Sequence, residues 1–230
     1  MSRVCCYVVG FNLYHAIEAL GRPEPKWLNL MALTCSFLEK KDTLSRVTYF
    51  TAVMKWNPAK ALRHREYIAA LTASGVDVVE SRFQKNGKYC NTYDRYCDFY
   101  EEKQTDVAFA VRVLSDAQRG VCDRVLLMTA DSDQIPLVQE VRERCPAISI
   151  EILAPPGRLR QARELCNVAS GFKEISPGRL GTCRLARNVP DENGNIVARC
   201  PAVYNTVRQS VSGYCDAKKK CPGVRRAMDE

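Results

Sequence analysis

The sequence predicts an α/β protein, a doubly wound and mostly parallel sheet followed by a basic C-terminal extension. Two observations predict this fold. Continuous β-prone apolar runs, such as residues 4–9 and 123–129, indicate strands that are buried on both faces. Between these runs lie segments with apolar residues at the three-to-four spacing of amphipathic helices. Strands that alternate with helices favour parallel pairing through right-handed crossovers.

The first half of the chain supplies three of about five expected strands. Residues 4–9 are apolar, residues 46–54 are β-branched and aromatic, and residues 76–79 follow the stop signal Ser74-Gly75. Helices are expected at 12–20, 27–38 and 58–71, the last of which has Pro58 in its first turn. Residues 86–99 are polar and rich in tyrosine and cysteine, without a clear period. They are therefore expected to form a loop or small insertion.

The second half repeats the alternation. A helix is expected at 101–117, with an apolar stripe of Val107, Ala110, Val111 and Leu114. Strands at 123–129 and 148–153 flank a helix at 133–144, and a short helix at 158–168 precedes a further strand at 171–175. The Asn193-Gly194 pair predicts a type I′ turn in a hairpin at about 185–205. The chain is thus expected to divide into a domain at 1–176 and an extension at 177–230 with a disordered tail.

Positive charge is concentrated in the last third of the chain. Residues 1–157 carry 20 basic and 19 acidic side chains, whereas residues 158–230 carry 14 and 7. This asymmetry favours a polyanionic partner, nucleic acid first. The competing interpretation is a solvated basic tail with no specific partner, and charge alone supports it nearly as well.

The apolar runs and the cysteines indicate the cellular compartment. No run approaches the roughly 20 apolar residues of a membrane span, so no membrane partner is expected. The N-terminus lacks the pattern of a secretory signal, which predicts a cytoplasmic protein with reduced thiols. The 12 cysteines include no C-x-x-C pair, so their spacing does not indicate a zinc site. A homo-oligomer or a protein partner is left open.

Three segments carry residues suited to chemistry. Asp131 and Asp133 follow a buried strand and open a helix, so they can share Mg²⁺ or Mn²⁺, but helix capping explains one of them equally well. Asp106 is expected beside an apolar stripe, where a carboxylate needs a partner or a cation; the alternative is an acidic first helical turn. Asn12 follows Gly10 at the end of the first strand, as a site residue or as a helix cap.

These three segments, in this order, resemble the NYN domain family, the LabA-like branch of the PIN-like nuclease superfamily. The matching stretches are 7–14, 102–107 and 130–136, and the resemblance extends over most of residues 3–205. It implies a three-layer PIN-like sandwich and metal-dependent endonucleolytic cleavage of RNA that is single-stranded, looped or tRNA-like. It assigns metal binding to Asp106, Asp131 and Asp133, and catalysis to these residues with Asn12.

One position departs from the family pattern. The chain has Val9 where NYN domains typically have an aspartate, and valine has no oxygen to bind a cation or orient a water. The chain as written is therefore expected to be an inactive or nearly inactive ribonuclease. The alternative is a natural pseudo-nuclease that binds RNA or regulates without cleaving. Tyrosines 89, 93, 96 and 100 are expected either to stack on RNA bases or to pack over the sheet.

Overall fold

A computed structural model of the protein describes residues 1–90 and 94–205. Seven strands form one sheet in the order β4-β3-β2-β1-β5-β6-β7. Their bounds are β1 Arg3–Val9, β2 Thr43–Ala52, β3 Asp77–Cys90, β4 Arg95–Lys103, β5 Arg124–Met128, β6 Ser149–Ala154 and β7 Gly171–Glu174. Every neighbouring pair is parallel except β3 and β4. The predicted doubly wound, mostly parallel α/β fold is confirmed.

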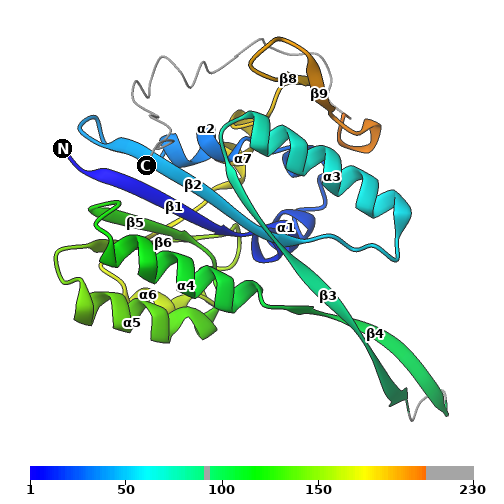
Figure 1. The fold of residues 1–230 in the computed structure, drawn as a ribbon, viewed down its shortest axis with the longest axis horizontal. Coiled ribbons are helices and arrows are strands. Elements are labelled where there is room, and N and C mark those ends of the chain that lie inside the picture. Colours follow the sequence, from blue (N-terminus) through cyan, green and yellow to red (C-terminus); the bar gives the residue numbers. More distant parts are fainter. Residues whose placement is uncertain (91–93, 206–230) are drawn as a thin grey trace.

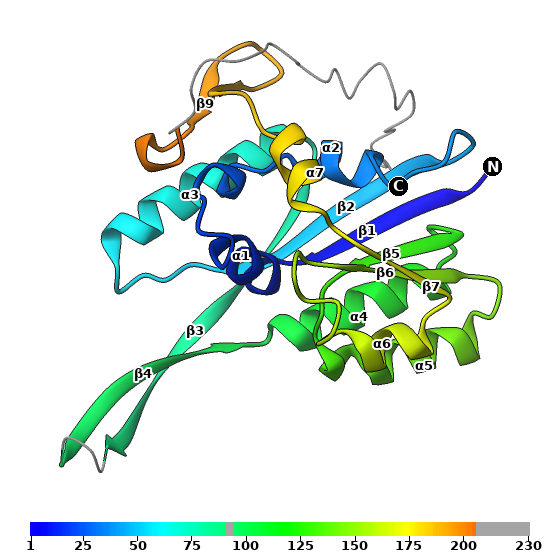
Figure 2. The ribbon, with the colours of Figure 1, turned by 180° about the vertical axis from the view of Figure 1, so that it is seen from behind.

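Helices cover both faces of the sheet (Figures 1 and 2). One face carries α1 Gly10–Glu18, α2 Leu30–Cys35, α3 Pro58–Ala73 and α7 Pro177–Thr182, and the other carries α4 Thr105–Gln118, α5 Ile135–Arg144 and α6 Arg163–Val168. Three 3₁₀ segments lie at Glu24–Lys26, Ser132–Gln134 and Ala202–Tyr204. The connection after β1 leads to the first face and the connection after β5 to the second. Ligand sites in such sheets form at the carboxyl edge beside this switch point.

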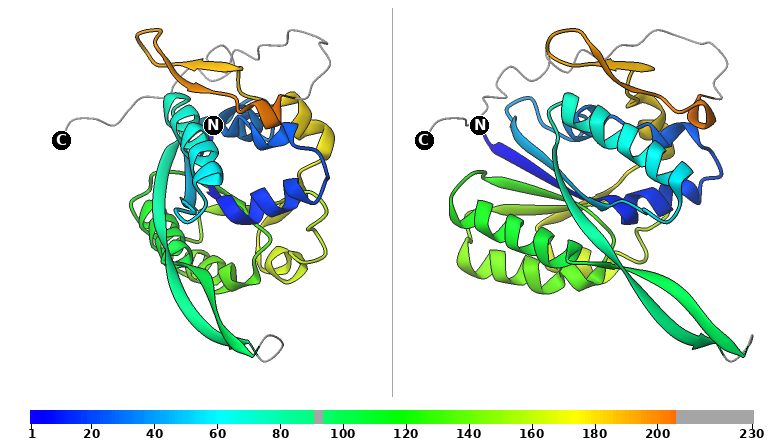
Figure 3. Two further views of the ribbon diagram at one scale, coloured as in Figure 1. Left: turned by 90° about the vertical axis from the view of Figure 1, so that its right-hand side faces the viewer. Right: turned by 45° about the vertical axis from the view of Figure 1, so that its right-hand side comes forward.

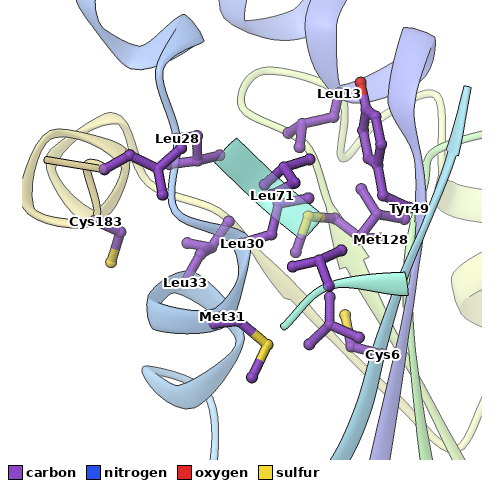
Figure 4. Packing of buried hydrophobic residues seen from close by; sticks show 14 of the residues in the cluster. Cys6, Leu13, Leu28, Leu30, Met31, Leu33, Tyr49, Leu71, Met128 and Cys183 are labelled. Atoms are coloured by element: carbon purple, nitrogen blue, oxygen red, sulfur yellow. The ribbon is translucent and has the colours of Figure 1, made fainter. Parts of the chain in front are cut away.

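The central strand β1 separates two apolar cores. Val4, Cys6 and Val8 enter the core under α1, α2 and α3, whereas Cys5, Tyr7 and Val9 enter the core under α4, α5 and α6. Figure 4 shows the first core, where Leu30 and Leu33 of α2 approach Cys6 and Met128 of the sheet. Because both faces of β1 are covered, its sequence is apolar throughout instead of alternating.

Within residues 86–99, expected to form a loop, the described residues 86–90 and 94–99 belong instead to a long antiparallel arm. Strands β3 and β4 pair from Arg82↔Lys103 to Cys90↔Arg95, and the arm projects away from the sheet (Figures 1 and 3). It is held by polar contacts such as the ion pair of Lys85 with Asp98 at 2.7 Å. A ribbon with solvent on both faces needs no apolar alternation, which is why its sequence shows none.

The predicted helix at 101–117 begins later and turns a different face to the core. Residues 101–103 end β4, and α4 starts at Thr105. The predicted stripe is half right. Ala110 and Leu114 pack against the core, but Val107 and Val111 are 68% and 62% exposed, and Phe109 and Val113 are buried instead. Phe109 sets the phase of the helix because its ring packs against Phe50, with 5.1 Å between centroids.

A buried carboxylate anchors α4 to the strands. Asp116 accepts hydrogen bonds from Tyr7 Oη at 2.9 Å, Arg46 at 2.8 Å and Arg112 at 2.9 Å. Burial alone would raise the pKa of Asp116, but the hydrogen bonds from Arg112, Tyr7 and Arg46 outweigh it and lower the pKa. The carboxylate is therefore ionised at neutral pH and ties three elements together.

Residues 177–205 pack onto the first core. Leu180, Cys183 and Leu185 are buried there, and Trp27 Nε1 donates to the Ala186 carbonyl at 2.8 Å. Strands β8 Asn188–Pro190 and β9 Ile196–Arg199 form the expected hairpin. Its turn is not type I′, because Gly194 has a positive φ of 88° but Asn193 does not. The expected disordered tail lies outside the described residues.

In the described ranges 1–90 and 94–205, none of the helices combines the length and the apolar character needed to cross a bilayer. The remaining expected elements are present, with ends that differ by a few residues. The largest differences are α2, which starts at Leu30 instead of 27, and α6, which starts at Arg163 instead of 158. Asn29 explains the first, because its side chain accepts a hydrogen bond from Ala32 N at 3.0 Å and caps the helix.

Candidate functional site

The carboxyl ends of β1 and β5 are joined by an asparagine. Asn12, in the first turn of α1, accepts a hydrogen bond from Ala130 N at 2.9 Å through its Oδ1. Asn12 is not the helix cap, because α1 begins at Gly10 and Val9 occupies the cap position without a side-chain hydrogen bond. The amide side chain therefore fixes the segment after β5 beside the start of α1, and this segment carries the two aspartates.

Asp131 and Asp133 occupy the turn that follows β5. Asp131 caps the short 3₁₀ segment, since its Oδ1 accepts from Asp133 N at 3.0 Å. Its own backbone N–H donates to Thr129 Oγ1 at 3.1 Å. Capping thus accounts for Oδ1 of Asp131, and it leaves Oδ2 available to a ligand. Asp133 is exposed to solvent.

Asp106 reaches this edge from α4, where it lies in the first turn. Gln134, which is almost fully buried, has its Nε2 3.4 Å from Asp106 Oδ1. Partial burial, followed by the negative charges of Asp131 and Asp133, raises the pKa of the Asp106 carboxyl. Three carboxylates from two separate segments therefore share one local field. The turn into α4 passes through Gln104, whose φ of 77° is unusual for a residue other than glycine.

A fourth acid at this edge was not singled out from the sequence. Glu102, at the end of β4, accepts a hydrogen bond from Thr105 Oγ1 at 2.6 Å. Burial raises the pKa of the Glu102 carboxyl, the hydrogen bond from Thr105 opposes this, and the charge of Asp106 adds to it. Its sequence signal was present, but Glu101-Glu102 suits an acidic first helical turn equally well. The β4 pairing, which the sequence does not reveal, decides between the two.

Val9 lies at the same edge but directs an apolar side chain into the protein. The parallel register pairs Val9 with Phe50 of β2 and ends against β5 at Val8↔Met128, so Val9 stands next to Thr129. Val9 is 6% exposed and belongs to the core that contains Phe50 and Phe109. This strand end contributes no oxygen to the acidic edge.

The donor set suits a hard cation that keeps much of its water. Within the described residues, no group of three or more His, Cys, Asp or Glu side chains is arranged to enclose a metal ion directly. Mg²⁺, however, is commonly bound through one or two carboxylates with several waters retained. The repulsion that raises the Asp106 pKa is the kind that a divalent cation relieves. The residues present therefore fit Mg²⁺ or Mn²⁺ in chemistry, without a closed set of direct ligands.

A family model matches most of this chain. The model of the NYN domain matches residues 12–176. The chain belongs to the NYN domain family. NYN domains are PIN-like nuclease domains, nucleases of this kind generally depend on divalent metals, and the domain implies RNA as the substrate. The match begins after Val9, so it does not include that position.

Two similar proteins add context. Over 232 aligned residues the chain is 25% identical to "6-hydroxy-3-succinoylpyridine 3-monooxygenase HspA" of Pseudomonas putida, with 84% of this chain and 73% of that protein covered. The crystal structure of VPA0982, a protein of unknown function from Vibrio parahaemolyticus, has 17% identity and a TM-score of 0.54, and covers 76% of this chain and 94% of that chain. The latter similarity concerns the fold alone.

Proposed function

We propose that the protein is a metal-dependent endoribonuclease of the NYN type that acts on single-stranded RNA, and that Val9 leaves the chain as written nearly inactive. Asp106, Asp131 and Asp133 hold Mg²⁺ or Mn²⁺ together with waters. The observation that carries the proposal is that Asp106 Oδ1 of α4 lies 3.4 Å from Gln134 Nε2, in the turn that also carries Asp131 and Asp133. Burial, and then the charges of these two aspartates, raises the Asp106 pKa. Within the family, the order of the three motifs favours the LabA-like branch, and cysteines that form no disulfide in the described part of the chain favour the cytoplasm.

Each site residue has a distinct part. When bound by these aspartates, Mg²⁺ or Mn²⁺ would supply an acidified water and positive charge opposite the scissile phosphate. Asn12 is a positioning residue, because its hydrogen bond to Ala130 N holds the segment of Asp131 and Asp133 in place. Gln134 orients Asp106. An aspartate at position 9 would add the missing oxygen ligand, and its replacement by Val9 removes a group whose loss commonly reduces rates about 10²–10⁴-fold.

The aromatic side of the arm suits single-stranded RNA. Trp56 stacks on Tyr100 with 3.7 Å between ring centroids and 7° between planes, and Phe83 meets Trp56 edge-on. Farther out, Tyr89 and Tyr96 are exposed. Exposed rings accept bases without regard to sequence, and the basic C-terminal third adds phosphate contacts. RNA loops and tRNA-like segments offer the unstacked bases such a surface needs.

Val9 favours an alternative in the same family, a natural RNA-binding or regulatory protein that does not cleave. The apolar side chain is well accommodated in its core, so the substitution does not strain the fold. This alternative retains the arm and the basic surface but assigns no chemistry to the three aspartates.

The similarity to the Pseudomonas monooxygenase supports a second candidate. That protein's name describes oxidation of a hydroxylated pyridine with a succinoyl side chain, and the alignment covers most of this chain. The second candidate is therefore oxidation of a small heteroaromatic acid. Oxygen consumption with 6-hydroxy-3-succinoylpyridine, NADH and purified protein tests it. Consumption that depends on this substrate supports it, and none above the NADH background rejects it.

Cleavage of a labelled single-stranded RNA tests the nuclease proposal. The chain as written, Val9→Asp, and Val9→Asp with Asp131→Asn are compared in Mg²⁺ or Mn²⁺ and in EDTA. We expect cleavage from Val9→Asp alone, abolished by EDTA. Metal-dependent cleavage by the chain as written would contradict its inactivity. A folded Val9→Asp variant that binds RNA but cleaves no RNA or DNA substrate would favour the non-catalytic alternative.

A further inference from the structure

A second feature of the carboxyl edge is a hollow on the opposite side of β1 from α4. It is bounded by the start of α1, the end of β2, α3 and the 3₁₀ segment at Ala202–Tyr204. Its cavity volume is about 80 Å³, and it opens to solvent. The hollow shares Gly10 with the strand end that carries Val9, but it is lined by none of the three aspartates.

The walls of the hollow are aromatic. The rings come from Phe11, Tyr14, Tyr49, His64 and Tyr67. The ring of Tyr49 packs against the backbone of Gly10, where an added Cβ would lie 2.7 Å from the Tyr49 ring and from the Phe50 carbonyl oxygen. Tyr67 is fixed by a hydrogen bond from its hydroxyl to the Leu28 carbonyl at 3.0 Å. Tyr49 and Tyr67 also pack edge to face on each other, with 5.8 Å between ring centroids. Rings held in this way form a rigid aromatic wall, against which a planar ligand can stack.

A polar group lies among the rings. His64 Nε2 is 3.0 Å from Thr51 Oγ1. Burial, with a smaller effect of the charge of Arg65, lowers the pKa of His64 to about 4. At neutral pH the imidazole therefore carries no charge, and because Nε2 is bonded to Thr51, only Nδ1 is left to donate to or accept from a polar group of a ligand.

Cationic side chains line the mouth. Lys26 is already paired with Glu18 at 2.9 Å. Lys60 and Arg63 also line the hollow, and neither forms an ion pair with any residue in the part of the chain that the structure describes. Arg63 is half-buried. A partly desolvated guanidinium without a carboxylate partner is suited to bidentate binding of a carboxylate or phosphate.

We propose that this hollow binds a small planar aromatic or heteroaromatic molecule that bears a negatively charged group, with the ring against the aromatic wall and the anion on Arg63 and Lys60. The site does not depend on RNA cleavage, because it uses none of the acidic residues. Two sources share this chemistry: a free aromatic carboxylic acid, and a nucleotide whose base enters the hollow and whose phosphate meets the mouth.

Binding measured by calorimetry, with ligand-observed NMR for weak ligands, tests the site. The anionic probes are benzoate and 4-hydroxyphenylacetate for the first source. For the second source they are uridine 5′-monophosphate and adenosine 5′-monophosphate. Benzamide and uridine are the matched neutral probes. We expect a dissociation constant of about 1 mM or tighter for at least one anionic probe. The set of probes that binds identifies the source, and the neutral counterpart should bind about 10-fold more weakly, equivalent to 1.4 kcal/mol.

Substitutions locate the binding. Arg63→Gln and Lys60→Gln should each weaken the anionic probe about 10-fold and leave its neutral counterpart unchanged. Arg65→Gln is the matched control, because Arg65 lies on the same helix, faces Glu80 at 3.9 Å and does not line the hollow. Gly10→Ala should weaken all probes, because the new methyl displaces the Tyr49 ring. Thermal unfolding confirms that each variant is folded.

Two results would overturn the proposal. One is the absence of saturable binding by every anionic probe at about 10 mM. The other is an equal effect of Arg63→Gln and Arg65→Gln, which would place the anion elsewhere. Because the assay measures binding and not turnover, it is independent of the cleavage test on Val9 and of the oxygen-consumption test.

Discussion

Replacing Val9 with aspartate should make the stability of the protein depend on Mg²⁺. The valine side chain is almost fully buried beside Phe50 and next to Thr129. An aspartate there would place a fifth carboxylate, counting Glu102, at an edge where burial and the charges of Asp131 and Asp133 already raise the pKa of Asp106. Without a cation, the new charge has neither water nor a positive partner.

The expected effect follows from two losses. Burial of a valine side chain contributes about 1.5–3 kcal/mol, and an uncompensated buried charge brings the total destabilisation to about 3–5 kcal/mol. At about 2–4 °C per kcal/mol for a chain of this size, the metal-free melting temperature should fall by roughly 6–20 °C. Mg²⁺ at about 100 times its dissociation constant should return about 2.7 kcal/mol.

Thermal unfolding of three proteins provides the assay. The chain as written, Val9→Asp and Val9→Asn are each melted in EDTA and across a Mg²⁺ titration. Val9→Asn is the matched control, because asparagine has the size and shape of aspartate without the charge. Val9→Asp should gain roughly 5–11 °C from Mg²⁺, whereas Val9→Asn and the parent should gain far less. Equal Mg²⁺ shifts in Val9→Asp and Val9→Asn would refute the argument that this edge is a cation site completed by position 9.

Three further predictions concern pH, an ion-pair network and the tail. The folded-state pKa of His64 is about 4, below its unfolded value of about 6.5. The contribution of neutral His64 to the free energy of unfolding is therefore complete above pH 6.5 and declines as the pH falls toward 4. Urea unfolding should show this decline in the parent and a flatter pH profile in His64→Gln. Asp116→Asn should destabilise by about 2–4 kcal/mol at pH 7, because a buried carboxylate that holds two arginines is lost. Because folding lowers the Asp116 pKa, the stabilisation by this carboxylate is present above the ordinary aspartate pKa and is lost as the pH falls through the folded-state pKa. An unchanged melting temperature of Asp116→Asn at pH 7 would contradict this prediction. Truncation after Asn205 removes six basic and three acidic residues and leaves the described fold whole. It should therefore weaken RNA binding and reduce the dependence of the binding constant on salt concentration. An unchanged salt dependence would argue against a role for the tail.

The buried strands were predictable because their information is local. Residues 4–9 and 125–128 are apolar throughout, a pattern typical of a strand covered on both faces. Their alternation with helical segments then fixed parallel pairing and the position of the carboxyl edge. The placement of Asp131 and Asp133 followed from the same reasoning, because they come directly after a buried strand. Which partner each acid would meet did not follow.

The arm and the start of α4 were not predictable in this way. A hydrogen-bonded ribbon in solvent need not alternate apolar and polar residues to bury one face, so the sequence of residues 86–99 resembled that of a loop. With β4 unrecognised, the helix was started too early, and its buried stripe was assigned to Val107 and Val111 instead of Phe109 and Val113. The actual phase is set by contacts of Phe109 with Tyr7 and Phe50, which are distant in sequence.

The sequence by itself determined the α/β class and the positions of the buried strands along the chain. It also determined the three segments that carry Asn12, Asp106 and the pair Asp131 and Asp133. Only the tertiary structure decided that Asp106 shares a field with that pair, that Glu102 joins them, and that an aromatic hollow lies on the other side of β1. The physical reason is that strand burial and capping are recorded within a few residues. Helix phase, strand pairing and the fields between carboxylates depend on side chains that the fold brings together from far apart.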